Sequence, residues 1–388
     1  MSKLKVATSQ RLLSALEDAP FDGLILGHPS NVAYATGYRS VAGAIASGAR
    51  MLACISGDRQ LLIAPAGDAA AALDSGISED DFIPYGRFFF ESSDGQHAAA
   101  SMSDVHADME SALTEAITRS GLTGTIGIDS LISEQIKSLL EEQNGVDAVA
   151  GANEWVLGIR SIKTPPEVDL LLSAIKCTEA GLNRALEAAY PGITERELAS
   201  FVAQSMVEAN AEPRFLVVTA GPRSALSDAR ATDRTWEPGE LLRFDVGCTY
   251  NGYWSDIGRT AVLGEASSEQ ERRYAAILAG EEAQLTQAKP GMTAGQLFDI
   301  AVEAVEDGGI TPYRRHHCGH AIGSDVYEWP IVAPNSDAEL QAGMVFCVET
   351  PYYCLGWGGM MVEDAIQITD EGNKKLTSLD RSLRVVPA

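Results

Sequence analysis

The chain has 388 residues, 45% of them hydrophobic, which is enough for two domains that each bury a core. Its 54 acidic and 29 basic residues give a net charge of −25, which argues against binding to nucleic acid or to an anionic membrane surface. No apolar run approaches the roughly 18 residues of a membrane span, and the start of the chain lacks the apolar core of a secretion signal. We therefore expect a cytoplasmic protein, whose six cysteines are reduced thiols.

The first part of the chain alternates between helical and strand patterns, which predicts an α/β unit. A loop is expected at 91–102, where the residues are small and polar. The expected helices cover 9–19 and 103–120, and the expected strands cover 22–27, 51–56, 60–65 and 125–130.

A domain boundary is expected shortly after Trp155. There the sequence GIRSIKTPPEVDLLLSA brings Pro165 and Pro166, which the first turn of a helix tolerates, and a long helix follows. We therefore divide the chain into a small α/β amino-terminal domain, 1–157, and a catalytic domain, 158–388.

The second part pairs long helices with β-hairpins, which is typical of the α+β class. Helices are expected at about 166–190, 195–210, 268–288 and 293–308. Strands are expected near 214–220, 241–247 and 253–263, and then in MVFCVETPYY and GGMMVEDAIQIT.

One of these hairpins carries two aspartates, in FDVGCTYNGYWSDIGRT. Asn251-Gly252 is a strong hairpin signal, because both central residues of a type I′ turn need positive φ. Asp245 then lies opposite Gly258, and Asp256 is its diagonal neighbour on the same face, at roughly 7–8 Å. Two carboxylates at this distance repel unless a cation lies between them. The alternative is that both are solvated on an exposed face.

Three of the six histidines, His316, His317 and His320, fall within the sequence HHCGH. A lone histidine is more often a structural hydrogen-bonding residue than a metal ligand, but this clustering favours a site. All three are candidate site residues.

A second hairpin is expected around Gly356 in the glycine-rich sequence CLGWGG. It places Glu349 opposite Glu363, each in an apolar strand where an unpaired carboxylate is costly to bury. Two hairpins and one histidine loop thus offer four carboxylates and an imidazole. Such an oxygen-rich set suits two divalent ions such as Mn, Fe, Co or Zn better than a structural zinc.

These residues resemble the ligands of the pita-bread metallopeptidase family, which includes prolidase, aminopeptidase P and methionine aminopeptidase, with creatinase as a metal-free relative. PSNVAYATGY resembles the amino-terminal domain of prolidases and creatinase. The resemblance implies that Asp256 and Glu363 bridge two metals, that Asp245 chelates one and that His320 binds the other. Glu349 would be both ligand and general base.

Three positions depart from the prolidase-like pattern. Asp228 stands where such peptidases carry a histidine, seventeen residues before the first metal aspartate. Tyr327 replaces a second histidine, seven residues after the metal histidine, and Met361 replaces an arginine two residues before the last glutamate. In the family these groups hold the substrate and support the metal ligands.

Three functions follow from this resemblance. The first is hydrolysis of a peptide or amide bond by a metal-activated water, as in Xaa-Pro dipeptidases and aminopeptidases. The second is a non-peptidase hydrolase or lyase of a small zwitterion, as in ectoine hydrolase, creatinase or dimethylsulfoniopropionate lyase. The third is an inactive binding module, like relatives among histone chaperones. A homodimer is expected because similar enzymes are dimeric.

Asp228 adds a negative charge beside an anionic ligand set, and this charge needs a cation. Either Arg223, Arg314 or Arg315 neutralises it structurally, or Asp228 receives a positively charged substrate group. In the second case Tyr327 would donate a hydrogen bond in place of the missing histidine.

Overall fold

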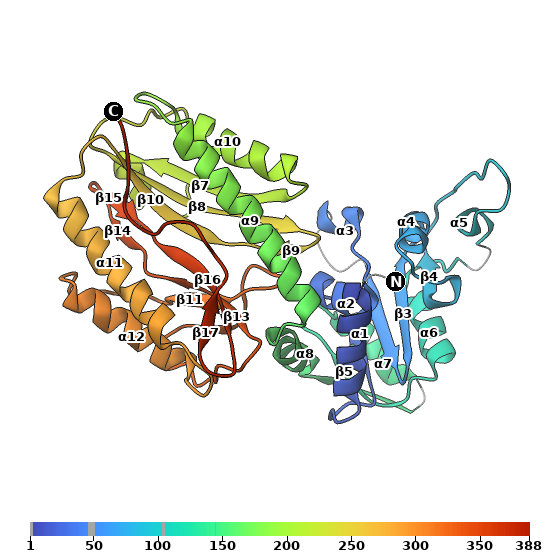
Figure 1. The fold of residues 1–388 in the computed structure, drawn as a ribbon. Coiled ribbons are helices and arrows are strands. Elements are labelled where there is room, and N and C mark those ends of the chain that lie inside the picture. The colour runs from blue at the N-terminus through green and yellow to red at the C-terminus, as the bar shows by residue number, and fades with distance from the viewer. Residues whose placement is uncertain (1–2, 46–50, 103–104, 144) are drawn as a thin grey trace. The chain divides into compact units, whose positions relative to one another are not determined.

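A computed structural model describes residues 3–45, 51–102, 105–143 and 145–388. The chain forms two compact units, Met1–Ile159 and Arg160–Ala388 (Figure 1). The division falls inside helix α8 (Ala152–Ser161), and the predicted boundary at 157/158 lies slightly earlier in the same helix. None of the described helices is long and apolar enough to cross a membrane.

The first unit is built on one mixed sheet of six strands. Strand β1 pairs antiparallel with β2 and parallel with β5. The strand order is β4 (Phe82–Tyr85), β3 (Arg59–Pro65), β2 (Leu52–Ser56), β1 (Gly23–Leu26), β5 (Gly124–Ile128) and β6 (Val146–Ala150).

Helices cover both faces of this sheet, because consecutive strand side chains point to opposite sides. Leu24 and Leu26 pack in one core cluster with residues of α1 (Lys3–Leu16), α2 (Pro29–Thr36), α4 (Ala69–Asp74) and α8. Ile25 packs in a second cluster with residues of α6 (Met109–Ser120) and α7 (Glu134–Glu142). The short helices α3 (Val41–Ile45) and α5 (Ala98–Ser101) complete the unit.

Three predicted boundaries in this unit were wrong. The first helix begins at Lys3 rather than at residue 9, and α5 lies within the predicted loop 91–102. The helix predicted from residue 103 begins only at Met109, because the Asp108 side chain caps it there. Residues 103–104 of that prediction lie outside the described residues.

The second unit contains two five-stranded sheets. The first has the order β18 (Arg384–Val386), β10 (Ile257–Leu263), β8 (Leu241–Tyr250) and β7 (Glu212–Ala220), with β9 (Tyr253–Trp254) paired to β8. The second has the order β12 (Glu328–Ile331), β11 (Gly319–Ala321), β13 (Val345–Glu349), β16 (Glu363–Ile368) and β17 (Asn373–Lys375). Strands β14 (Tyr352–Cys354) and β15 (Gly358–Met360) pair separately.

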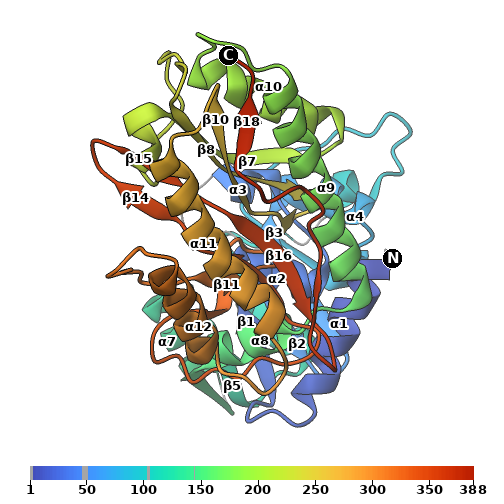
Figure 2. The same cartoon turned by 60° about the vertical axis from the view of Figure 1, so that its left-hand side comes forward.

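Two pairs of long helices flank these sheets (Figure 2). Helices α9 (Pro165–Glu187) and α10 (Glu195–Glu208) pack against the first sheet, and α11 (Ser268–Gln287) and α12 (Ala294–Asp307) pack against the second. Each begins with a capping box, in which a Ser or Thr and a Glu or Gln three residues later satisfy free backbone N–H groups. The α+β class predicted from the sequence is confirmed.

The aspartate hairpin has the predicted register. Asn251 and Gly252 have φ values of 48° and 80°, as a type I′ turn requires. Asp245 lies opposite Gly258 in the β8–β10 pairing, which confirms the prediction.

The glutamate hairpin also has the predicted register. Glu349 pairs with Glu363, and further along Cys354 pairs with Gly358 around the turn at Gly356. Hydrogen bonds join the two hairpins: the Thr260 hydroxyl donates to the Met361 carbonyl at 2.8 Å, and the Met361 N–H donates to the same hydroxyl at 2.7 Å. These bonds bring the carboxylates of both hairpins to one place.

Candidate metal centre

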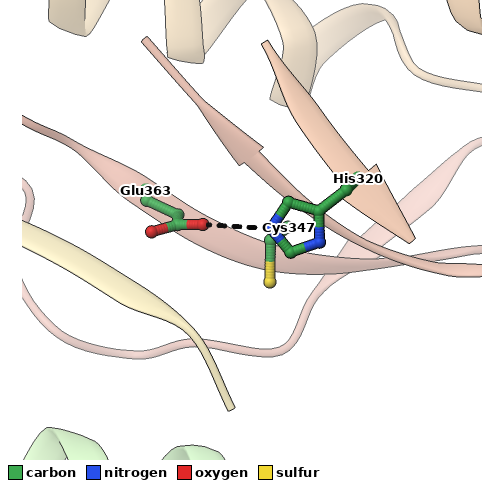
Figure 3. Close-up of side chains that lie close together, drawn as sticks. All are labelled: His320, Cys347 and Glu363. Atoms are coloured by element: carbon green, nitrogen blue, oxygen red, sulfur yellow. Dashed lines mark ion pairs between the residues drawn. The ribbon is translucent and has the colours of Figure 1, made fainter. Parts of the chain in front are cut away.

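Three carboxylates converge where the two hairpins meet. Asp245 comes from β8, Asp256 from the break between β9 and β10, and Glu363 from the start of β16. One oxygen of each lies within 4.8 Å of the others. Glu363 also belongs to a second group within 4.8 Å, with His320 and Cys347 (Figure 3). Glu363 therefore occupies the middle of the cluster.

These carboxylates are in an environment that disfavours their charge. Asp256 and Glu363 are 5% and 1% exposed. Burial, and then the negative charge of Asp256, raise the pKa of Asp245 to about 7. Burial is also the main cause that raises the pKa of Asp256, and burial with the neighbouring carboxylates raises that of Glu363 well above its usual range. A cation among the three would relieve this cost.

The free lone pairs in the cluster fit such a cation. Within the described residues, Asp256 Oδ1, Glu363 Oε2 and His320 Nε2 are buried without a hydrogen-bond partner. His320 Nδ1 lies 3.1 Å from the Ala321 carbonyl, so the ring donates its proton there and leaves a lone pair on Nε2. That nitrogen is 3.5 Å from Asp256 Oδ2 and 3.9 Å from Glu363 Oε1. His320 could therefore act as a metal ligand through Nε2.

Cys347 also belongs to this cluster, although it was not predicted from the sequence. It pairs with His320 across β11 and β13, and its sulfur lies 3.7 Å from the Asp256 carbonyl. Burial raises its pKa well above the usual value, so the thiol is neutral and a poor ligand beside the carboxylates. Its position two residues before Glu349, and hence on the same strand face, was the available signal.

Glu349 lies across the ladder from Glu363, but its carboxylate belongs to neither group of three close ligand atoms within the described chain. Its Oε1 is 2.9 Å from His317 Nδ1, and its Oε2 is 3.9 Å from Arg315 Nη2. Burial acts to raise the pKa of Glu349, but His317 and Arg315 outweigh it and hold that pKa below its usual value. The lowered pKa keeps the Glu349 carboxylate ionised, so it could accept a proton at the edge of the cluster.

The two other predicted aromatic site residues differ in their contacts. The Tyr327 ring stacks on His320 with 4.0 Å between centroids, and its side chain remains open to solvent on one side, with the residue 54% exposed. His316 is exposed and reaches the cluster only through His317, whose ring centroid is 4.2 Å away. Tyr327 thus covers a candidate ligand, whereas His316 lies one residue further out.

A buried ion-pair network fixes the residue next to Tyr327. Glu328 bonds Arg160 at 2.5 Å and Lys163 at 2.8 Å, and all three are buried. Burial alone would raise the pKa of Glu328, but Lys163 and Arg160 outweigh it and lower the pKa to about 2. The sequence RSIK, which begins the second unit, therefore helps to position Tyr327 over His320.

Asp228 is exposed, and its Oδ2 accepts a hydrogen bond from the Ser227 hydroxyl at 3.1 Å. Among the residues that the structure describes, no arginine forms an ion pair with it. Arg223 instead binds Glu195 at 3.0 Å, and Arg315 lies beside Glu349. The structural neutralisation considered for Asp228 is therefore not found.

Arg243 is a cation of the site that the sequence reasoning missed. It is fully buried, and its Nη1 lies 3.0 Å from Asp245 Oδ2 and 3.9 Å from Met361 Sδ. The Arg243 guanidinium thus places a positive charge beside both Asp245 and Met361. Position 361 is where the family pattern has an arginine. Its position two residues before Asp245, on the same strand face, was the signal.

Comparison with family models identifies both units. Residues 169–370 match the model of metallopeptidase family M24, and residues 9–162 match that of the creatinase/prolidase N-terminal domain. The Xaa-Pro dipeptidase of Pyrococcus furiosus is 34% identical over 263 residues, which cover 67% of this chain and 76% of that protein. The uncharacterized peptidase YqhT of Bacillus subtilis is 27% identical over 97% of this chain and 99% of its own.

Solved structures of similar fold cover nearly the whole chain. The X-Pro aminopeptidase from Thermotoga maritima superposes with a TM-score of 0.80 at 25% identity, over 97% of this chain and 99% of that one. The prolidase from Pyrococcus furiosus gives 0.77 at 27% identity, over 95% and 100%.

Proposed function

Because the chain belongs to metallopeptidase family M24, we propose that this metal-dependent hydrolase cleaves the bond between an amino-terminal residue and a following proline. Relatives named Xaa-Pro dipeptidase, at 31–34% identity, support this substrate class. The observation that carries the proposal is the cluster of buried, unpartnered carboxylate oxygens around the free Nε2 of His320.

We propose that Asp245, Asp256, His320 and Glu363 hold about two divalent ions, with Glu349 as a fifth ligand. Mn, Fe, Co and Zn all suit this donor set. Glu363 belongs to both groups of close ligand atoms and would help to hold both ions. When bound, the ions lower the pKa of a water molecule and polarise the scissile carbonyl.

The surrounding residues supply the proton transfer and the orientation. Glu349, which His317 holds ionised, accepts a proton from the attacking water and delivers it to the leaving nitrogen. His317 keeps the carboxylate oriented through its 2.9 Å contact. Tyr327, stacked on His320, limits the access of solvent to that side of the cluster.

The test is hydrolysis by protein that has been stripped with a chelator and then supplied with single metals. The panel contains Xaa-Pro dipeptides, longer peptides with proline at position two, ectoine, creatine and a sulfonium betaine. Xaa-Ala dipeptides are the matched control for proline. We expect metal-dependent cleavage of an Xaa-Pro substrate. Turnover of only the small zwitterions would instead support the non-peptidase alternative, in which Asp228 receives a substrate cation.

We also propose a homodimer, which rests on the similarity of the whole chain to prolidase-like enzymes. Light scattering coupled to size-exclusion chromatography measures this directly, and a monomeric mass at working concentrations would contradict it.

A further inference from the structure

We propose that Cys347 is a ligand at one of the two metal positions, and that this position selects an ion that prefers sulfur, such as Zn²⁺. This inference rests on the proposed metal-dependent function and specifies how the two metal positions differ.

The close ligand atoms of the cluster form two groups with different donors. The first group joins Asp245, Asp256 and Glu363, so all its donors are carboxylate oxygens. The second joins His320, Cys347 and Glu363, and so combines an imidazole nitrogen, a sulfur and a carboxylate oxygen. In each group the atoms lie within 4.8 Å of one another. Two ions held by these groups would therefore meet different donor atoms.

The pairing of three neighbouring strands places the Cys347 side chain in the second group. Cys347 lies in β13, directly opposite His320 of β11 and Ala365 of β16. Side chains of directly opposite residues share a face of the sheet, and so do those of residues two apart on one strand. Glu363, two residues before Ala365, is thus on this face too, and Figure 3 shows the side chains of the second group together. The sulfur is therefore positioned by the register of the sheet, and not by a loop.

The two partners of Cys347 in this group have free ligand atoms. His320 is 0% exposed and Glu363 is 1% exposed. In the described part of the chain, neither His320 Nε2 nor Glu363 Oε2 has a hydrogen-bond partner. Polar atoms that are buried so deeply without a partner are costly. A cation bound by this nitrogen, this oxygen and the sulfur would remove that cost.

The buried Cys248 of the same unit has different surroundings. Its Sγ lies 3.3 Å from the Thr178 hydroxyl and 3.4 Å from the Ala174 carbonyl. Among the residues that the structure describes, no cysteine except Cys347 belongs to a group of candidate ligand atoms. A sulfur beside buried metal ligands is therefore a particular feature of Cys347, and not of the way this fold buries thiols.

The donors of the second group suit zinc. In proteins Zn²⁺ binds cysteine sulfur, histidine nitrogen and carboxylate oxygen, whereas Mn²⁺ favours carboxylate and water. Without a metal the Cys347 thiol is neutral and a poor ligand. A thiol that coordinates a divalent ion releases its proton to solvent, and the thiolate then binds the ion as an anion. Cys347 should therefore raise the affinity for Zn²⁺ far more than the affinity for Mn²⁺.

The first test is titration of chelator-treated protein with Co²⁺, which gives a near-ultraviolet charge-transfer band when a thiolate binds it. The variants are Cys347→Ser, which replaces sulfur by oxygen, Cys347→Ala and, as the control, Cys248→Ser at a buried thiol outside both groups. Wild type and Cys248→Ser should show the band, and both variants of Cys347 should lack it. Co²⁺ that binds wild type without this band would overturn the role of Cys347 and leave the metal centre intact. No binding of Co²⁺ would count against the metal centre and the proposed function.

The second test measures the affinities for Zn²⁺ and Mn²⁺ separately, by competition with a chelating indicator. Cys347→Ser should lower the affinity for Zn²⁺ about tenfold or more and change the affinity for Mn²⁺ little. Thermal unfolding of the metal-free variants checks that they are folded, and the Co²⁺ spectrum of wild type decides the question even if a variant is not. Equal losses for both ions, or unchanged affinity for both, would overturn the proposed selectivity.

Discussion

Glu349 differs from the other carboxylates of the candidate centre in its charge state. Asp245, Asp256 and Glu363 have raised pKa values, whereas His317 and Arg315 overcome the effect of burial at Glu349 and lower its pKa. A carboxylate that stays ionised can accept a proton at neutral pH. The environment of each carboxylate, and not its residue type, separates the proposed proton acceptor from the other three.

Glu349→Gln tests this assignment. The amide keeps the shape of the side chain but cannot take up the proton, so we expect turnover to fall by about 10²-fold or more, with a smaller change in KM. Steady-state kinetics on an Xaa-Pro dipeptide measures both, and elemental analysis of the variant checks that metal is retained. Turnover near that of wild type would place the base elsewhere, with Asp228 the first candidate.

The four carboxylates proposed as ligands could be found from the sequence because hairpin pairing follows from turn chemistry and strand periodicity. His320 was found from the clustering of histidines and the family resemblance. Arg243 and Cys347 were missed, although each lies two residues from a named carboxylate on the same strand face. The direction of the Glu349 side chain, toward His317, depends on tertiary packing and was not predictable.

The close approach of strands β11 and β13 determines the position of His320 in the cluster. Gly319, which precedes it, has a φ of 138°, and a Cβ there would clash with the Cys347 carbonyl of β13. Only glycine allows this approach. The backbone at Gly319 therefore fixes where the His320 ring enters the cluster.

Gly319→Ala should displace β11 from β13, lower the melting temperature and weaken metal binding, because His320 moves with the strand. Gly239→Ala is the matched control: its φ is also positive, at 82°, but no atom lies within 4 Å of the added Cβ. We expect the control to lose about 1 kcal/mol of stability, with normal metal affinity. Thermal unfolding and metal titration compare them, and equal effects of both substitutions would contradict this account.

Element boundaries were predicted best where capping or turn residues mark them. The helices beginning at Pro165 and Glu195 start as predicted within a residue, because Thr164 and Thr194 open capping boxes. The single-turn helix Ala98–Ser101 was predicted as loop, because four residues carry no measurable periodicity.

The buried acidic residues of the cluster make the folding stability of the whole protein depend on pH. The unfolded chain releases the proton of Asp245 near pH 4, whereas the metal-free folded protein keeps it up to about pH 7. The folded state therefore holds more protons in this window, and the stability of metal-free protein falls as pH rises through it. Raised pKa values at Asp256 and Glu363 act in the same direction.

Bound metal should reverse this trend, because its ligands are deprotonated and binding releases their protons. We expect the difference in melting temperature between metal-loaded and chelator-treated protein to be larger at pH 7.5 than at pH 5. Scanning calorimetry at the two pH values measures it. An equal difference in melting temperature at both pH values would mean that these carboxylates do not release protons when metal binds.

The most direct test of the central claim is the metal content of purified wild type and of Asp256→Ala and Glu363→Ala, measured by elemental analysis after reconstitution. Wild type should hold about one to two transition metal ions per chain. Each variant should be nearly empty, because losing a shared carboxylate loosens both ions and leaves the remaining acids in mutual repulsion. A wild type that binds no metal, or an Asp256→Ala protein with full metal content, would contradict the proposed centre.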